Sequence, residues 1–325
     1  MEKEIGFGII GCGAIGAKRA DATSRVIGVF DIDSNKAKAL SKKHNAKQYT
    51  SIVQMVQDTN IEAIIVATPN NQLAPCTKAA VEHGKHVLVE KPAGINVAEL
   101  QIIADIASSN NTLIRIGFNH RYHPALQKAK QIIEGGNIGE IMFIRGRYGH
   151  GARKGYEKEW RANPLLSGGG ELIDQGIHLI DLSRWFLGEF TKINGFTATY
   201  FWDMPVDDNA FISLRTEDGR AAWLQVSCTE WKNMFSYEIY GKTGKIQIDG
   251  LGGSYGTEKI TLYKMTEAMG PPDTSSWEYP RGDMSWVEEL NEFKQDILQQ
   301  RNPSPNIVDA IQALKIVEAI YTKKE

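Results

Sequence analysis

Residues 5–20, IGFGIIGCGAIGAKRA, join a short apolar strand to a glycine-rich turn and the start of a helix. The turn, residues 11–16, has the G-x-G-x-x-G spacing of a dinucleotide-binding turn. Gly11 would allow the tight turn, Gly13 would let the backbone approach a pyrophosphate, and Gly16 would let helix and strand pack closely. The free N–H groups at the start of the helix, including those of Ala14 and Ile15, would then face the anion.

A second apolar strand, residues 26–30, supports this interpretation because it ends in Asp31. An acidic residue about 20 positions after the first glycine binds an adenosine ribose hydroxyl. Asp31 would repel the additional phosphate of NADP, Asp33 adds negative charge, and the nearest cation is Lys36. The sequence therefore predicts NAD as the cofactor.

The length and composition of the chain exclude several classes of protein. A chain of 325 residues predicts two domains, and a net charge of −2 without a Lys/Arg block argues against binding nucleic acid. The three cysteines lie far apart, which fits neither a disulfide framework nor a metal site. Residues 1–4 have no apolar character, and no apolar run approaches the roughly 20 residues that span a membrane. We expect a cytoplasmic protein without a metal.

Strands and helices alternate through the first 120 residues. We expect strands at 61–67, 86–89 and 113–118, and helices at 34–45, 52–58, 75–83 and 97–108. This alternation predicts a doubly wound parallel sheet, the Rossmann architecture, in a domain spanning residues 1–120. Because ligands bind beyond the carboxyl ends of such strands, the residues that follow them should line one cofactor crevice; they are Thr68, Pro69, Asn70, Glu90, Lys91 and Asn119.

Residues 121–325 have a different pattern, which predicts an α/β substrate-binding and oligomerisation domain. We expect helices at 124–134, 172–185, 285–299 and 307–321, and strands at 141–148, 193–201, 210–216, 221–229, 235–240, 245–249 and 259–263. Hairpin signals at 217–220 and 241–244 predict a large, open, mostly antiparallel sheet. If one helix covers one face, the other face is available to a second subunit, so we expect a homodimer or homotetramer.

The helix at 172–185 is apolar nearly all round but contains Asp174, His178 and Asp181 at helical spacing. Ionisable side chains on a buried helix are costly unless they are paired or functional. These residues could form a core His–Asp pair, or Asp174 could orient His178 as a general base. Lys91 presents the same choice between a solvated loop lysine and a group that hydrogen-bonds a reacting oxygen.

The segment 145–161 is basic and aromatic, and it contains the candidate substrate-binding residues Tyr148, Arg153, Tyr156, Trp160 and Arg161. It could be an ordinary solvated loop, or it could bind an anionic group such as a diphosphate or carboxylate while aromatic rings stack on a sugar. Neutral sugars and cyclitols remain open as substrates. Arg121 faces the same crevice by its position in the sequence.

These motifs together resemble the Gfo/Idh/MocA oxidoreductase family over almost the whole chain. The matching motifs are Gly11-x-Gly13-x-x-Gly16, Ala67-Thr68-Pro69-Asn70, Glu90-Lys91-Pro92, Gly117-Phe118-Asn119, Trp160-Arg161 and the run from Ser167 through Asp174-x-Gly176-x-His178-x-x-Asp181. The resemblance implies a Rossmann domain, an α/β domain with an open sheet, a bound nicotinamide, and oxidation or reduction at a sugar or cyclitol hydroxyl carbon. It also implies that Lys91, Asp174 and His178 form the catalytic group. Leu73 departs from the family, since many members have histidine there.

The residues agree with that chemistry. His178 can take the hydroxyl proton, Asp174 can stabilise the resulting imidazolium, and Lys91 can stabilise the developing alkoxide. Two other functions compete with a dehydrogenase: a glycosidase that oxidises a hydroxyl transiently and regenerates NAD, and a regulator that binds NAD or sugar without catalysis. Net accumulation of NADH would separate the glycosidase, and loss of Lys91 and His178 would indicate a regulator; both residues are present.

Overall fold

The computed structural model describes residues 4–323, so the first three residues of the N-terminal segment considered above lie outside the described part. Two compact units divide the chain. Unit 1 contains residues 4–118, 165–168 and 286–314, and unit 2 contains 119–164, 169–285 and 315–323. The first segment of unit 1 ends close to the predicted domain boundary at residue 120. Residues 286–314, which the prediction assigned to the second domain, pack in unit 1.

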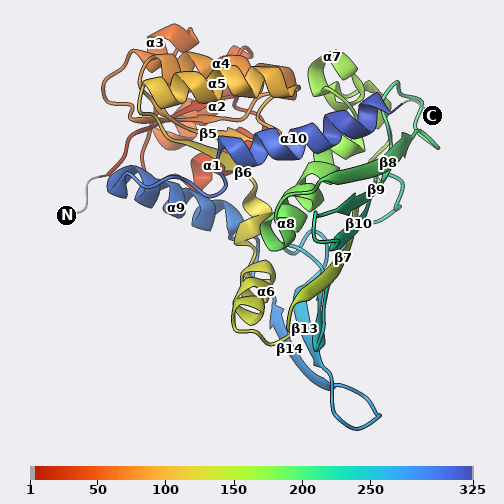
Figure 1. Cartoon of the computed structure of the whole chain (residues 1–325). Coiled ribbons are helices and arrows are strands. Elements are labelled where there is room, and N and C mark those ends of the chain that lie inside the picture. Colours follow the sequence, from red (N-terminus) through yellow and green to blue (C-terminus); the bar gives the residue numbers. More distant parts are fainter. Residues whose placement is uncertain (1–3, 324–325) are drawn as a thin grey trace. The chain divides into compact units, whose positions relative to one another are not determined.

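Unit 1 is built on a six-stranded parallel sheet with the order β3-β2-β1-β4-β5-β6 (Figure 1). The strands are β1 (Phe7–Ile10), β2 (Val26–Phe30), β3 (Lys47–Gln48), β4 (Ala63–Val66), β5 (His86–Glu90) and β6 (Ile114–Gly117). β1 and β4 are completely buried, as expected of central parallel strands covered on both faces. The predicted Rossmann architecture is confirmed.

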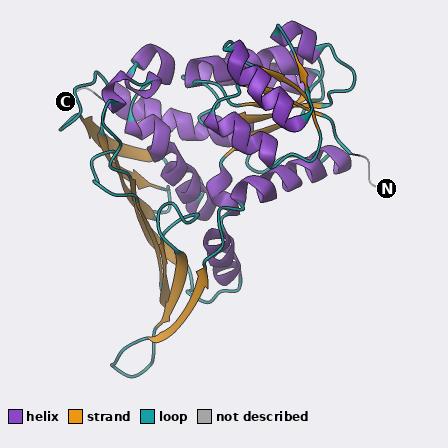
Figure 2. Cartoon of the chain, turned by 180° about the vertical axis from the view of Figure 1, so that it is seen from behind, coloured by secondary structure: helices purple, strands orange, loops and turns teal. Residues whose placement is uncertain are grey.

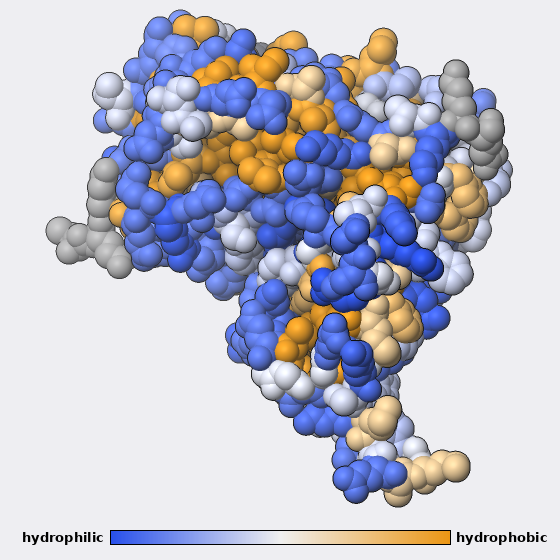
Figure 3. All heavy atoms as spheres, viewed as in Figure 1, coloured by the Kyte–Doolittle hydropathy of each residue, from blue (hydrophilic) through white to orange (hydrophobic). Residues whose placement is uncertain are grey.

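The helices of unit 1 follow the predicted alternation with small shifts at their ends. They are α1 (Ala14–Asp21), α2 (Ser34–His44), α3 (Ile52–Val56), α4 (Asn70–Glu82), α5 (Val97–Ser109) and α9 (Ser285–Gln299), whose Ser285 is counted in unit 2. α4 begins five residues before the predicted Pro75, which lies inside the helix although proline usually starts one. Figure 3 shows hydrophobic residues at the surface over α5, where Ile102 is 53% exposed.

The last segment of unit 1 completes its hydrophobic core. Leu290, Phe293 and Ile297 of α9 are buried with apolar residues of β1, α1 and α2, and the Phe293 ring lies 6.4 Å from that of Phe7. Arg115 of β6 donates to Asp296 of α9 at 3.0 Å, and both side chains are buried. The apolar side of α9 therefore packs into the core of the Rossmann unit.

Unit 2 contains an eight-stranded, mostly antiparallel sheet, shown in Figure 2 as the large group of orange strands. Its order is β14-β13-β12-β11-β7-β10-β9-β8. The strands are β7 (Ile141–Gly149), β8 (Lys192–Ala198), β9 (Asn209–Arg215), β10 (Ala221–Ser227), β11 (Met234–Gly241), β12 (Gly244–Asp249), β13 (Glu258–Lys264) and β14 (Asp273–Tyr279). β7 pairs in parallel with β10 and separates it from β11, so the strands do not all follow as successive hairpins. β14 was not predicted, because its sequence is polar.

The helices of unit 2 pack beside this sheet. They are η1 (Asn119–Tyr122), α6 (Pro124–Glu134), η2 (Tyr156–Lys158), η3 (Trp160–Ala162), η4 (Leu172–Gly176) and α8 (Ile177–Leu187); α7 (Pro164–Ser167) and α10 (Ile307–Thr322) contain residues of both units. The predicted helix 172–185 is only in part α-helical, because η4 is a π-helix. π-Helical turns are rare and occur often at functional sites. Within residues 4–323, no helix is both long and apolar enough to cross a membrane.

Candidate active site

The glycine turn of unit 1 leaves room for a ligand at the start of α1. A Cβ atom on Gly11, whose φ is +94°, would lie 2.4 Å from the carbonyl oxygen of Ala67, and one on Gly16 would lie 1.8 Å from that of Gly11. A Cβ on Gly13, the residue that precedes α1, would meet nothing within 4 Å. No side chain caps the helix at Gly13. This open helix N-terminus fits the pyrophosphate of a dinucleotide.

Asp31 is held in place at the end of β2 by two backbone groups. Its Oδ2 accepts from the N–H of Cys12 at 2.6 Å, and its Oδ1 accepts from the N–H of Asp33 at 2.8 Å. The carboxylate is thereby tied to the glycine turn, which fits a role in binding the adenosine ribose. Ile32 beside it is 98% exposed, so a larger side chain at that position would meet no steric barrier.

The residues after β4 and β5 are also fixed by neighbours in unit 1. Asn70 starts α4, and its Nδ2 donates to the carbonyl oxygen of Ser167 at 2.8 Å. Thr68 and Pro69 connect β4 to that helix. Leu73, the departure from the family pattern, is completely buried in α4 and contributes to the apolar core.

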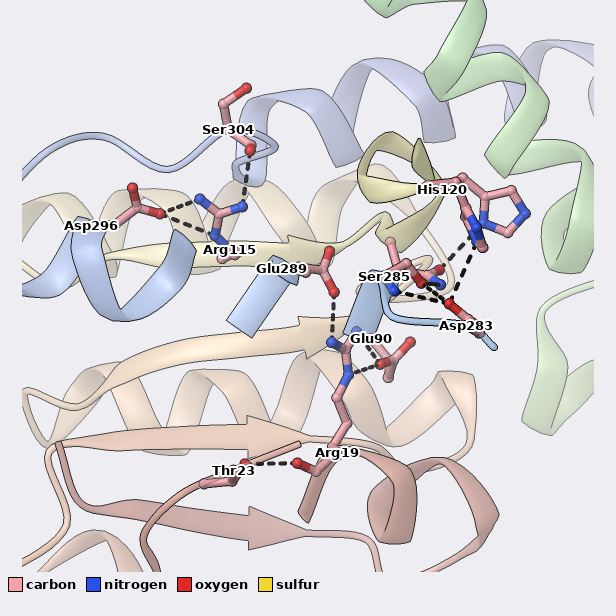
Figure 4. A network of polar contacts seen from close by, with 12 residues as sticks. Arg19, Thr23, Glu90, Arg115, His120, Asp283, Ser285, Glu289, Asp296 and Ser304 are labelled. Carbon is pink, nitrogen blue, oxygen red and sulfur yellow. Dashed lines mark hydrogen bonds and ion pairs between the residues drawn. The ribbon is translucent and has the colours of Figure 1, made fainter. Parts of the chain in front are cut away.

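Glu90, which precedes Lys91, belongs to a buried ion cluster drawn in Figure 4. Its Oε1 accepts from Arg19 Nε at 2.6 Å, and Arg19 Nη1 lies 2.6 Å from Glu289 Oε2. The guanidinium also lies over the ring of Trp286, 4.5 Å from its centroid. Glu90 is therefore part of a buried ion cluster, and the cofactor contact expected of it stays a prediction. The Lys91–Pro92 peptide, whose isomer the sequence left open, is cis.

Unit 2 brings the predicted acid–base residues into one polar cluster. Asp174 on η4 accepts from Arg161 Nε at 3.1 Å, and both belong to segments that were predicted to meet substrate. His178 on α8 is 5% exposed, and its ring lies 6.3 Å from that of Tyr148. Burial lowers the pKa of Arg161, but Asp174 outweighs this effect and the net pKa is raised. Burial also raises the pKa of Tyr148 well above its usual value.

Asp181 and Arg121 form a separate pair. Arg121 Nε donates to Asp181 Oδ2 at 2.8 Å, Arg121 Nη2 donates to Oδ1 at 2.5 Å, and both side chains are buried. This two-point contact joins η1 to α8. The substrate contact expected of Arg121 stays a prediction.

The other arginines of the segment 145–161 also have carboxylate partners. Arg153 Nη2 lies 2.7 Å from Glu159, Arg145 Nε lies 2.5 Å from Glu238, and Arg147 Nη2 lies 3.5 Å from Glu230. With the Asp174 pair, each arginine of this segment has a carboxylate within ion-pair distance. The arginines of this segment are therefore paired with carboxylates, of which Glu159 lies in the segment and Glu230, Glu238 and Asp174 lie outside it.

Sequence reasoning missed two histidines of unit 2. His120 stacks on His178, with ring centroids 3.8 Å apart. His150 lies 3.4 Å from Glu171, and Tyr156 donates to the same oxygen of Glu171 at 3.0 Å. Burial lowers the pKa of His150, but its hydrogen bond to Glu171 outweighs this and the pKa is raised. The signal in the sequence that could have indicated them is their position, since His120 follows β6 and His150 follows β7.

The ring of Trp160 contacts Arg161, whose guanidinium carbon lies 4.6 Å from the ring centroid. Asn119, predicted to bind cofactor, lies in unit 2, and its Nδ2 donates to Ser285 Oγ at 2.8 Å. Among the described residues, no group of three or more His, Cys, Asp or Glu side chains is placed to hold a metal ion.

Comparisons with known proteins match models to both units. A model described as "Oxidoreductase family, NAD-binding Rossmann fold" matches residues 5–118, and one described as "GFO/IDH/MocA C-terminal domain" matches residues 126–247. The chain belongs to the Gfo/Idh/MocA oxidoreductase family. Membership confirms the predicted family, an oxidoreductase activity and the predicted cofactor NAD.

Several Gfo/Idh/MocA proteins are similar over most of the chain. Levoglucosan dehydrogenase of Pseudarthrobacter phenanthrenivorans is 27% identical over 82% of this chain and 78% of its own length. The scyllo-inositol 2-dehydrogenase (NAD(+)) of Bacillus subtilis is 24% identical over 97% of this chain and 93% of its own. A solved structure of levoglucosan dehydrogenase in complex with NADH has a TM-score of 0.89 at 22% identity, covering 98% of this chain and 96% of that one, and so has the same fold.

Proposed function

We propose that this chain is an NAD-dependent dehydrogenase that oxidises a ring hydroxyl of a neutral sugar or cyclitol. The observation that carries the proposal is the polar cluster of unit 2, where a buried histidine on α8 lies near Tyr148 and follows Asp174 by one helical turn. A general base for an alcohol must lie within hydrogen-bond reach of the hydroxyl proton and have a free nitrogen or oxygen lone pair to accept it. An imidazole such as that of His178 can supply this lone pair near neutral pH.

The proposed reaction divides between groups of this chain. NAD, when bound, accepts the hydride from the hydroxyl carbon. An unprotonated ring nitrogen of His178 takes the hydroxyl proton, and Asp174 stabilises the imidazolium that results. The Lys91 ammonium donates a hydrogen bond to the developing alkoxide oxygen. The products are the carbonyl compound, NADH and a proton that His178 later releases to water.

The pairing of the arginines supports a neutral substrate. A phosphate or carboxylate group is bound best by a guanidinium that has no competing anion. Arg145, Arg147, Arg153 and Arg161 each lie beside a carboxylate, so binding an anion would first require breaking a pair. Levoglucosan and inositol, named for two relatives, are neutral polyols of the proposed class.

The test is a screen for NADH formation by absorbance. Levoglucosan, scyllo-inositol, myo-inositol and D-xylose represent the proposed class, and glucose 6-phosphate and a nucleotide sugar represent anionic substrates. We expect net NADH with at least one neutral compound and less with the anionic ones. Cleavage of a glycoside without net NADH would indicate the glycosidase, and binding without any turnover would indicate the regulator.

A further inference from the structure

Two buried imidazoles lie face to face in unit 2. The rings of His120 on η1 and His178 on α8 have centroids 3.8 Å apart and planes only 20° from parallel. Each histidine is 5% exposed. Two imidazolium charges at this separation would repel each other strongly where little water screens them. We therefore expect at most one of the two rings to be a charged imidazolium at any time.

A chain of hydrogen bonds fixes which nitrogen of His120 carries hydrogen (Figure 4). Ser285 Oγ donates to Asp283 Oδ1 at 2.6 Å, and Asn119 Nδ2 donates to the same hydroxyl oxygen at 2.8 Å. Asn119 Oδ1 therefore faces His120 Nδ1, at 3.3 Å. Because an amide oxygen only accepts, Nδ1 of His120 must be the nitrogen that bears hydrogen. When His120 is neutral, this contact therefore selects its Nδ1–H tautomer.

The charged neighbours of the pair have other partners. His123 Nδ1 lies 3.0 Å from Glu258, and its Nε2 lies 3.9 Å from Asp283. Other titratable and charged groups near the two rings include Tyr148, whose ring is 5.2 Å from that of His120, Tyr255 beside Tyr148, the pair of Arg161 with Asp174, and the pair of Arg121 with Asp181. The carboxylates of Glu258 and Asp283 lie beside His123, and that of Asp181 binds Arg121.

We propose that His120 is a positioning residue for His178, held as the neutral Nδ1–H form by Asp283, Ser285 and Asn119. The flat face of the His120 ring lies against His178. Because His120 stays neutral, His178 is the ring of the pair that becomes an imidazolium. A π face at this distance also favours the imidazolium formed when His178 accepts the substrate proton. The inference rests on the proposed function only in giving His178 the role of base.

Histidine-selective ¹⁵N NMR of the full chain tests this inference without a substrate. We expect His120 to keep the Nδ1–H form across the pH range in which His178 titrates. Ser285→Ala removes the hydroxyl that orients Asn119, so the Nε2–H form of His120 should appear; Ser275→Ala, at an exposed position on β14, is the control that should leave both signals unchanged.

Variants of His120 test the contact itself. In His120→Ala the titration midpoint of His178 should fall by about half a unit to one pH unit, because the imidazolium loses the π face. His120→Phe keeps a flat ring and should restore the midpoint. Titration of His120 in place of His178, or a rise of the His178 midpoint in His120→Phe, would overturn the proposal. So would an unchanged tautomer in folded Ser285→Ala. None of these readouts depends on finding a substrate, so the proposed function can fail while this inference holds.

Discussion

His178 and Lys91 are the residues whose removal tests the proposed chemistry most directly. We predict that His178→Ala and Lys91→Ala each lower turnover by about 10²–10⁴-fold, or about 3 to 5 kcal/mol of barrier, because each removes a group that acts on the transferring proton or the alkoxide. NAD affinity, measured by calorimetry, should be almost unchanged, because neither residue belongs to the glycine turn or to Asp31. The rate of oxidation should also rise with pH as His178 loses its proton, and this rise in the pH–rate profile should be absent in His178→Ala.

Matched controls are available at exposed positions of unit 1. His83→Ala removes a histidine that bonds its own helix at α4, and Lys78→Ala removes a lysine whose Nζ lies 3.7 Å from Glu82 at the surface. Both should keep native turnover. Near-native turnover in His178→Ala, with the same rise of the rate with pH, would show that His178 has a structural role. The candidates for the base would then be Lys91, Tyr148 and Tyr156.

Asp31 determines the second prediction at this scale. Asp31→Ser combined with Ile32→Arg should shift the preference toward NADP, because a carboxylate that repels the additional phosphate is replaced by a guanidinium that can bind it. The exposed position of residue 32 leaves room for the longer side chain. The measurement is the ratio of dissociation constants for NAD and NADP in both proteins. Equal affinities in the native protein would contradict the role given to Asp31.

The sequence reveals some site residues better than others. The turn at Gly13 and the strand end at Asp31 could be predicted because both depend on neighbours close in the chain. The ion pair of Arg121 could not, because its partner Asp181 lies 60 residues away. His120 was missed for the same reason, since nothing near residue 120 indicates that α8 will bring His178 against it.

At the scale of elements, a buried ion cluster links α1, β5 and α9. Burial raises the pKa of Glu289 from 4.5 to about 7; Glu90 adds to the shift, and Arg19 opposes it. The folded chain therefore binds more protons than the unfolded chain between these pH values, so the free energy of unfolding falls as pH rises from about 4.5 to about 7 and stays lower above that. Integrated over this range, the effect is about 3 kcal/mol.

We predict that Glu289→Gln removes much of this pH dependence. The variant cannot ionise at residue 289, and Arg19 keeps its contact with Glu90, so its melting temperature should fall less than that of the native protein between pH 5 and pH 8. Thermal unfolding followed by circular dichroism gives both curves. Glu288→Gln, one residue earlier in the first turn of α9, serves as the control. Parallel curves for the native protein and Glu289→Gln would show that Glu289 is ionised throughout.

Some helices and strands could be predicted from local sequence patterns, and others could not. The central strands of unit 1 could be predicted because a parallel strand buried on both faces is a continuous apolar run, as in residues 63–66. The edge strand β3 was not predicted, because its two residues are polar and exposed. The π-helical turn at η4 could not, since its residues have the same apolar periodicity as an α-helix. The placement of β7 between β10 and β11 depends on pairing across more than 70 residues, which no local hairpin signal specifies.

At the scale of the whole molecule, the sheet of unit 2 leaves apolar side chains on the face opposite its core. Along β10, Ala222, Leu224 and Val226 are buried while Trp223 between them is 68% exposed. Phe196 on β8 is 44% exposed and stacks on Phe211 of β9, with ring centroids 4.9 Å apart. Phe196 and Phe211 thus share with Trp223 the outer face of neighbouring strands. Exposed aromatic side chains gathered on one face are typical of an interaction site.

We predict that the protein self-associates through this outer face of the sheet. A second copy presents the same aromatic surface, so a two-fold interface would bury Trp223 and Phe196 of both copies. The double variant Trp223→Lys with Phe196→Lys places charges on that surface and should give a monomer with native circular dichroism, because neither side chain belongs to the buried core. Light scattering at micromolar concentration measures the mass, and Ile102→Lys, an exposed apolar position on α5 in unit 1, is the matched control that should leave it unchanged. A monodisperse monomer of the native protein at that concentration would refute the prediction. Unchanged assembly of the double variant would instead place the interface on another surface.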